Sequence, residues 1–153
     1  MEEYIQDILS NLLTALGEEF GHIQIDHTTN IDNEEEYYCN VETKNASLLI
    51  GKNGQNMQAI QVLVKLILLK RTGKNININL DVDSYKVRQE ESTIGLAERH
   101  IAKAIETGKP QSLPPMTPYY RRLVHMHISE KYPNLATSSK GFGNYRHIVV
   151  NKK

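Results

Sequence analysis

The sequence has one cysteine and no tryptophan among its 153 residues. A single thiol, Cys39, excludes an internal disulfide framework and a cysteine-rich zinc site, and it fits a reducing cytosol. Long hydrophobic runs are also absent, since the longest, VLVKLILL, is far shorter than the roughly 20 residues that span a membrane. The N-terminal segment MEEYIQDILS is acidic and lacks the apolar core of a signal peptide. We therefore expect a cytoplasmic protein without membrane insertion.

Basic residues are scarce at the start of the chain and acidic residues are scarce at its end, although the net charge is zero. Residues 1–45 contain 11 acidic and one basic residue, residues 46–110 contain six acidic and ten basic, and residues 111–153 contain one acidic and seven basic. A basic region of this kind attracts a polyanion, and an acidic region avoids it. Charge alone does not separate this hypothesis from a balance that only keeps the protein soluble.

Hydrophobic spacing predicts a complete α+β unit in residues 1–82. We expect a helix over residues 4–16, strands at HIQID and YYCNV, an acidic loop between them (Asn30, Asp32, Asn33 and Glu34 to Glu36), a short apolar turn over 46–50, a helix over 55–70 and a strand at INININLDVD. One face of the last strand is polar, which indicates a sheet covered on one side only. The second helix is apolar nearly all round between Val62 and Leu69, so it should pack on more than one side.

Residues 83–153 predict a second, smaller α+β domain. We expect a linking helix over 84–108, a Pro-rich connector over 110–118, a helix to about Lys131 and a hairpin at LATSSKGFGNYRHIVV with its turn near residues 140–144. The linking helix should bury one apolar face, formed by Ile94, Ala97, Ile101, Ala104 and Ile105. The chain would then divide into domains at 1–82 and 83–153.

The segment LLIGKNGQNMQAI is the strongest functional signal. Glycine lets a phosphodiester backbone approach closely, and the free amides and dipole at a helix N-terminus attract phosphate. Lys52 adds a positive charge and Asn53 adds donors. A bare GxxG string is usually only a turn, and a P-loop is excluded because GxxxxGK[ST] is absent. The surrounding element order favours nucleic-acid binding by Gly51, Lys52, Asn53, Gly54 and Gln55.

This segment and its element order resemble a KH domain of the bacterial type, with an N-terminal helix and the core IGxxGxx(I/M)xxI. The resemblance covers about residues 1–82. It implies a three-stranded sheet covered by helices on one face, and a loop that grips about four nucleotides of a single strand.

A second signal is PYYRRLVHMHI. Arg121 and His125 are four residues apart and share one helical face, where a guanidinium and an imidazole can both meet phosphate. The alternative is a pair that braces the helix against the hairpin. Arg122, Lys140 and Arg146 would extend the same basic surface, and Tyr145 is equally suited to the core.

This Arg-x-x-x-His helix, with the Pro-rich connector before it and GFGNYRHIVV after it, resembles the R-3-H domain, whose members bind single-stranded nucleic acid. A KH domain followed directly by an R-3-H domain is similar to the Jag family, also called KhpB. That resemblance implies a bacterial cytosolic RNA-binding regulator tied to cell elongation and division, with a small single-KH protein as partner. Many members carry a further N-terminal domain. We expect this chain to begin at the first KH helix, so roles of that domain are not carried over.

Catalysis is not expected. His125, His127 and His147 suggest a nuclease or a histidine metal site, but helical geometry points the rings of His125 and His127 about 200° apart. Glu130 is the only acid in the C-terminal segment. We therefore predict no cofactor and no metal, and single-stranded RNA or single-stranded DNA as ligand. The alternative function is an interaction adaptor that forms a homodimer, or pairs with a single-KH protein, through its KH domain.

Overall fold

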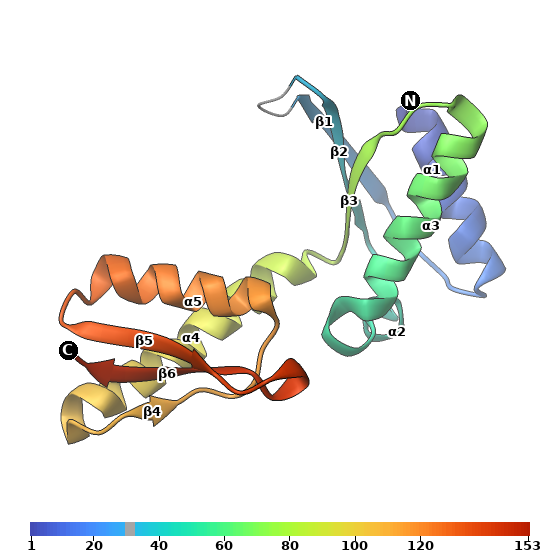
Figure 1. The fold of residues 1–153 in the computed structure, drawn as a ribbon. Coiled ribbons are helices and arrows are strands. Elements are labelled where there is room, and N and C mark those ends of the chain that lie inside the picture. Colours follow the sequence, from blue (N-terminus) through green and yellow to red (C-terminus); the bar gives the residue numbers. More distant parts are fainter. Residues whose placement is uncertain (30–32) are drawn as a thin grey trace. The chain divides into compact units, whose positions relative to one another are not determined.

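The computed structural model describes residues 1–29 and 33–153, which form two compact units, Met1–Tyr85 and Lys86–Lys153 (Figure 1). Each unit has its own three-stranded sheet and its own hydrophobic core. The fold class is therefore α+β, as predicted. Asn30 and Asp32 of the expected acidic loop lie outside the described residues.

The first unit follows the predicted element order. Its elements are α1 (Glu2–Ala15), β1 (Ile23–Thr29), β2 (Glu35–Val41), α2 (Ala46–Ile50), the 3-10 turn η1 (Lys52–Gly54), α3 (Gln55–Thr72) and β3 (Asn77–Val82). The predicted acidic loop extends too far toward the C-terminus, because Glu35 and Glu36 belong to β2. They pair with Thr29 and Thr28 of β1, so the hairpin ladder continues past the hydrophobic residues that mark the strand in the sequence.

The sheet of the first unit has the order β1-β2-β3, with β2 antiparallel to β1 and parallel to β3. Alternation turns Tyr37, Cys39 and Val41 into the core, where Cys39 lies opposite Leu80. Burial raises the pKa of the Cys39 thiol to about 12, so this side chain is a protonated core group. The other face is polar, and on it Asn79 donates a hydrogen bond to Glu36 over 2.6 Å.

Helix α3 is apolar on two faces, but only one of them is buried, whereas the sequence predicted packing on more than one side. Met57, Ile60, Val64 and Leu68 are buried against the sheet and α1. On the opposite side of the helix are residues that we call the outer stripe, each between 43% and 56% exposed: Val62, Leu63, Leu66 and Leu69. One face therefore builds the core, and the other faces outward in the single chain.

The second unit contains one strand that sequence patterning missed. Its elements are α4 (Tyr85–Thr107), whose first residue belongs to the first unit, β4 (Gln111–Ser112), α5 (Pro118–Lys131), β5 (Leu135–Lys140), the 3-10 turn η2 (Gly143–Tyr145) and β6 (His147–Lys152). The sheet has the order β4-β6-β5, and β6 is antiparallel to both neighbours. Strand β4 lies inside the predicted Pro-rich connector, and two residues are too few to show a hydrophobic period.

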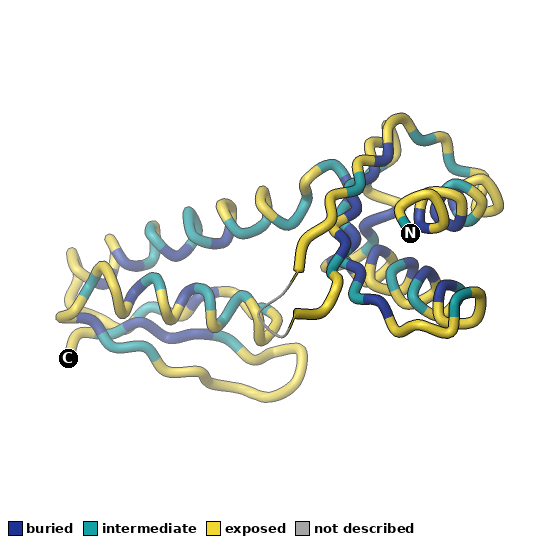
Figure 2. The backbone as a smooth tube through the Cα atoms, turned by 90° about the horizontal axis from the view of Figure 1, so that it is seen from above, coloured by how far each residue is buried: buried dark blue, intermediate teal, exposed yellow. Residues whose placement is uncertain are grey.

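Helices α4 and α5 supply one core with the sheet of the second unit (Figure 2). That core consists of Ala97, Ile101, Ala104, Leu113, Val124, Ile128, Leu135, Ile148 and Val150. The predicted apolar face of α4 included Ile105, which is exposed, and it left out Thr93, which is buried. Successive helical residues are 100° apart, so the stripe through Ala97, Ile101 and Ala104 leaves Ile105 at its edge. No helix within the described residues is long and apolar enough to cross a membrane.

Candidate nucleic-acid interface

The loop between α2 and α3 is shaped by backbone conformations that favour glycine. Gly51 has φ 69° and Gly54 has φ 77°, and Asn53 between them also has a positive φ of 53°. A Cβ atom at Gly51 would lie 2.5 Å from Cγ of Asn56, so a side chain cannot enter there without displacing Asn56. Gly54 is buried, whereas Lys52, Asn53 and Gln55 are exposed. The loop therefore presents polar side chains on a tightly turned backbone.

Hydrogen bonds hold this loop to the two helices. The Gly51 amide donates to the Ser47 carbonyl over 2.9 Å, and the Asn56 side-chain amide donates to the Leu48 carbonyl over 2.8 Å. At the N-terminus of α3, which lies within the described range 33–153, no side-chain cap is formed. The Gln55 amide, the first of α3, donates to the Lys52 carbonyl, so an anion at this end would be attracted chiefly by the positive end of the helix dipole. The predicted residues 51–55 thus form one surface, which we call the KH loop.

A second group of basic residues meets on the second unit. The Nη1 atom of Arg121 on α5 donates to the Met116 carbonyl over 2.6 Å, and the Met116 amide donates to the Arg146 carbonyl over 3.2 Å. The Nε atom of Arg146 donates to Ser139 Oγ on β5 over 2.9 Å. The connector before α5 therefore brings Arg121 and Arg146 to the same end of the helix.

His125 lies one turn further along α5 and contacts the same strand. Its Nδ1 atom is within hydrogen-bond distance of Thr137 Oγ1. Thr137 and Ser139 are two residues apart on β5, so they share the face of the strand that meets α5. Arg121, His125 and Arg146 consequently form one group, which we call the Arg–His cluster.

The remaining predicted residues lie at the margins of this cluster. Arg122 is exposed and adjoins Arg121 on α5. Lys140 is exposed at the end of β5, but alternation points it to the face opposite Ser139. Tyr145, for which the core was one alternative, is exposed. Phe142 is also exposed, and sequence reasoning missed it, although an aromatic residue between two glycines in a polar turn was a signal for it.

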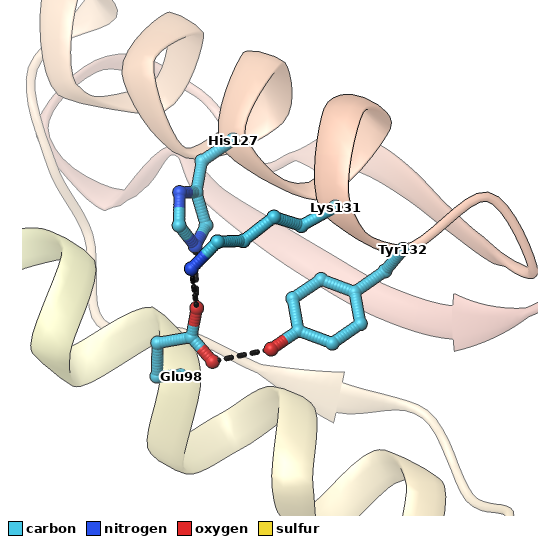
Figure 3. A network of polar contacts seen from close by, with 4 residues as sticks. All are labelled: Glu98, His127, Lys131 and Tyr132. Atoms are coloured by element: carbon cyan, nitrogen blue, oxygen red, sulfur yellow. Dashed lines mark hydrogen bonds and ion pairs between the residues drawn. The ribbon is translucent and has the colours of Figure 1, made fainter.

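His127 belongs to a different network, centred on Glu98 of α4 (Figure 3). The Nε2 atom of His127 lies 2.5 Å from Glu98 Oε1, and the hydroxyl of Tyr132 donates to Glu98 Oε2 over 2.6 Å. Lys131 Nζ is 3.7 Å from Glu98 Oε1. The Tyr132 hydrogen bond, followed by that of His127, lowers the pKa of Glu98 below its usual value. This network joins α4 to α5.

The two histidines of α5 therefore contact different elements, His125 the strand β5 and His127 the helix α4. Their rings diverge as the helical spacing predicted. Across residues 1–29 and 33–153, no group of three or more His, Cys, Asp or Glu side chains is placed to hold a metal ion.

Two family models match the two units. The KH domain of KhpA/KhpB matches residues 6–82, and the R-3-H domain matches residues 91–152. The chain belongs to the KhpB family. The KH loop and the Arg–His cluster thus lie in the KH and R-3-H domains, respectively.

Two curated relatives are both named RNA-binding protein KhpB. The chain is 33% identical over 123 residues to the RNA-binding protein KhpB of Clostridium symbiosum, covering 80% of this chain and 54% of that protein. It is 34% identical over 110 residues to RNA-binding protein KhpB of Bacillus subtilis, covering 71% and 52%. The chain spans about half the length of these two relatives.

Proposed function

We propose that this chain is a non-catalytic RNA-binding protein that binds single-stranded RNA at the KH loop and at the Arg–His cluster. The observation that carries the proposal is the exposed pair Lys52 and Asn53, held on a glycine-flanked turn at the uncapped N-terminus of α3. The two relatives are named RNA-binding proteins, which supports RNA as the ligand.

At the KH loop, a phosphate would meet three kinds of attraction. The positive end of the α3 dipole favours its charge, Lys52 supplies a mobile cation, and the Asn53 side chain supplies amide donors. Because Gly51 has no side chain, the sugar-phosphate backbone can lie against the main chain there, whereas the buried Gly54 shapes the turn from within.

At the Arg–His cluster, the strand would cross from α5 to the hairpin. Arg121 uses Nη1 for the Met116 carbonyl, and the guanidinium has further donors for phosphate. His125 uses Nδ1 toward Thr137, so Nε2 is the atom that a strand would meet. Arg146 and Arg122 add charge on either side. The bracing contacts position these groups, so a support role and a binding role are compatible here.

The chain itself offers a matched control for testing the KH loop. Gly73-Lys74-Asn75, at the other end of α3, repeats the sequence Gly51-Lys52-Asn53, and Lys74 and Asn75 are also exposed. We would compare two double variants. The first combines Lys52→Asp and Asn53→Asp, and the control combines Lys74→Asp and Asn75→Asp, which changes the net charge by the same amount. Fluorescence anisotropy with a labelled 12-residue RNA should show at least a tenfold loss of affinity, roughly 1.4 kcal/mol, for the first pair only.

Salt and strand type complete this experiment. About five phosphate contacts predict a slope near −3.5 in a log–log plot of affinity against salt concentration. Duplex RNA should bind more weakly, and the same 12-residue sequence as DNA tests the preference for RNA. Equal losses for the two double variants, a flat salt response or stronger duplex binding would contradict the proposal.

A second candidate function rests on the outer stripe of α3. Four large apolar side chains exposed along one helix favour a protein contact. We propose, as the alternative, that the KH domain pairs through this stripe with a second copy of the chain or with a small single-KH protein. The KH loop and the basic residues 111–153 are the features that this alternative leaves unused.

The cellular part of the proposal rests on the family resemblance. We infer a bacterial regulator, located in the cytosol, that is linked to cell elongation and division. Crosslinking in cells followed by sequencing of the bound RNA would identify its targets. Loss of crosslinking in the Lys52→Asp, Asn53→Asp variant, with retention in the control variant, would connect those targets to the KH loop.

A further inference from the structure

The turn between β5 and β6 exposes two aromatic rings. Phe142 is 89% exposed and Tyr145 is 80% exposed, which makes them the most exposed large hydrophobic side chains in the described parts of the chain. Single exposed apolar residues are common on protein surfaces. Two rings on one short turn, outside either hydrophobic core, require a further explanation.

The main chain fixes the turn that carries these rings. The Tyr145 amide donates to the Phe142 carbonyl over 3.1 Å, and the Arg146 amide donates to the Gly143 carbonyl over 3.2 Å. Gly141 has φ 84°, and a Cβ atom there would lie 2.9 Å from the Tyr145 carbonyl oxygen. The backbone is therefore closely packed around the turn, so a ligand that contacts the rings meets a surface that is already ordered.

The charge around the rings indicates the chemistry of the ligand. Lys140 and Arg146 flank the turn, and Arg146 belongs to the Arg–His cluster. Residues 111–153 contain seven basic residues and one acidic residue. Flat apolar rings beside cations match the alternation of bases and phosphates in a nucleic-acid strand. A duplex conceals the faces of its bases, so the complementary ligand is a single strand.

We propose that Phe142 and Tyr145 form a stacking platform for unpaired bases, next to phosphates bound by Arg146 and Lys140. This inference rests on the proposed function and adds to it the part of the ligand that this turn recognises. Within the second unit, Arg121 would contact the backbone of the strand, whereas the platform would contact base faces. Stacking is tolerant of sequence because every base has a flat face.

Alanine substitution separates stacking from charge. Phe142→Ala and Tyr145→Ala should each lower affinity for the single-stranded 12-residue RNA about tenfold, while the salt slope stays unchanged. Lys140→Ala should reduce the magnitude of that slope by about 0.7. Tyr4→Ala, at an exposed aromatic residue of α1, is the matched control and should leave affinity unchanged. Melting temperatures should not change for Phe142→Ala, because the ring lies outside the core.

The absence of tryptophan makes a direct optical test possible. In Phe142→Trp the new indole is the only one in the chain. This variant should bind more tightly than Phe142→Ala, because the indole can also stack. Bases that stack on the indole should quench its fluorescence. An abasic strand of equal length should bind more weakly and cause little quenching. Binding by all variants without quenching, or equal affinity of Phe142→Ala and the unmodified chain, would overturn this inference alone. Failure of the unmodified chain to bind any single strand would overturn the proposed function and this inference together.

Discussion

The side chain of Arg121 donates a hydrogen bond to the main-chain carbonyl of Met116 over 2.6 Å. This bond ties the first turn of α5 to the connector before it, and the Met116 amide continues the chain of contacts to Arg146. One guanidinium thus supports the fold and supplies charge to a candidate binding surface. Substitution experiments must therefore measure both properties.

We expect Arg121→Ala to lower the free energy of unfolding by about 1–2 kcal/mol, because the Met116 carbonyl loses a charged donor. Affinity of the folded protein for single-stranded RNA should also fall, by a similar factor for all sequences, since phosphate contacts carry no sequence information. Arg121→Lys should retain part of the affinity through its charge. Thermal melting and anisotropy on the same samples test this. A lower melting temperature with normal affinity of the folded fraction would reduce Arg121 to a bracing role.

Binding at the Arg–His cluster should depend on His125, whose Nδ1 atom faces Thr137, so that Nε2 would meet the strand. His125→Ala should therefore lower affinity for single-stranded RNA roughly threefold to tenfold, measured by anisotropy at one fixed pH. His127→Gln is the comparison variant and should leave affinity unchanged, since His127 contacts Glu98 instead. Equal affinity of His125→Ala and the unmodified chain would remove His125 from the site.

The outer stripe of α3 should mediate self-association or pairing with a single-KH protein. Burying such apolar side chains stabilises a complex by about 25 cal/mol for each Å² removed from water. Leu66→Asp places a charge in the middle of the stripe and should give a monomer by sedimentation. Val87→Asp changes an equally exposed apolar residue on α4 and should leave the association state unchanged. An unmodified chain that stays monomeric at high concentration and does not bind a single-KH protein would contradict this prediction.

The Glu98 network should make stability depend on acid. Hydrogen bonds from Tyr132 and His127 hold the pKa of Glu98 below its usual value in the folded protein. A carboxyl whose folded pKa is lowered stabilises the fold above the unfolded pKa, near 4.3 for glutamate, and that stabilisation disappears as pH falls through the folded pKa. Glu98→Gln should therefore melt at a lower temperature at pH 7.

The difference between Glu98→Gln and the unmodified chain should shrink as the pH falls through the lowered pKa of Glu98, because the carboxyl is then protonated as well. Tyr132→Phe removes the largest cause of the lowered pKa and should show a smaller effect of the same sign. Glu106→Gln, at an exposed position of the same helix, is the control. A difference that persists unchanged at low pH would show that Glu98 acts through packing and not through its charge.

Local patterns determined most of the secondary structure and the KH loop. Alternation in INININLDVD buried Ile78, Leu80 and Val82, and the glycines at 51 and 54 adopt the positive φ values that their turn requires. These features depend on neighbours within a few residues, so a period of 2 or 3.6 and the special backbone freedom of glycine are enough to predict them. The two apolar faces of α3 were visible for the same reason.

Only the tertiary structure decided the contacts between distant segments. Strand β4 forms because β6 returns beside Gln111 and Ser112, and Ile105 is exposed because the partners of α4 cover a narrower stripe. Glu98 meets His127 from 29 residues away, and Arg121 meets Arg146 only through the main chain of Met116. Such contacts depend on how helices and strands pack against one another. The spacing of hydrophobic residues along the sequence does not specify that packing. The sequence therefore predicted the candidate binding residues, and packing decided which of them lie close together.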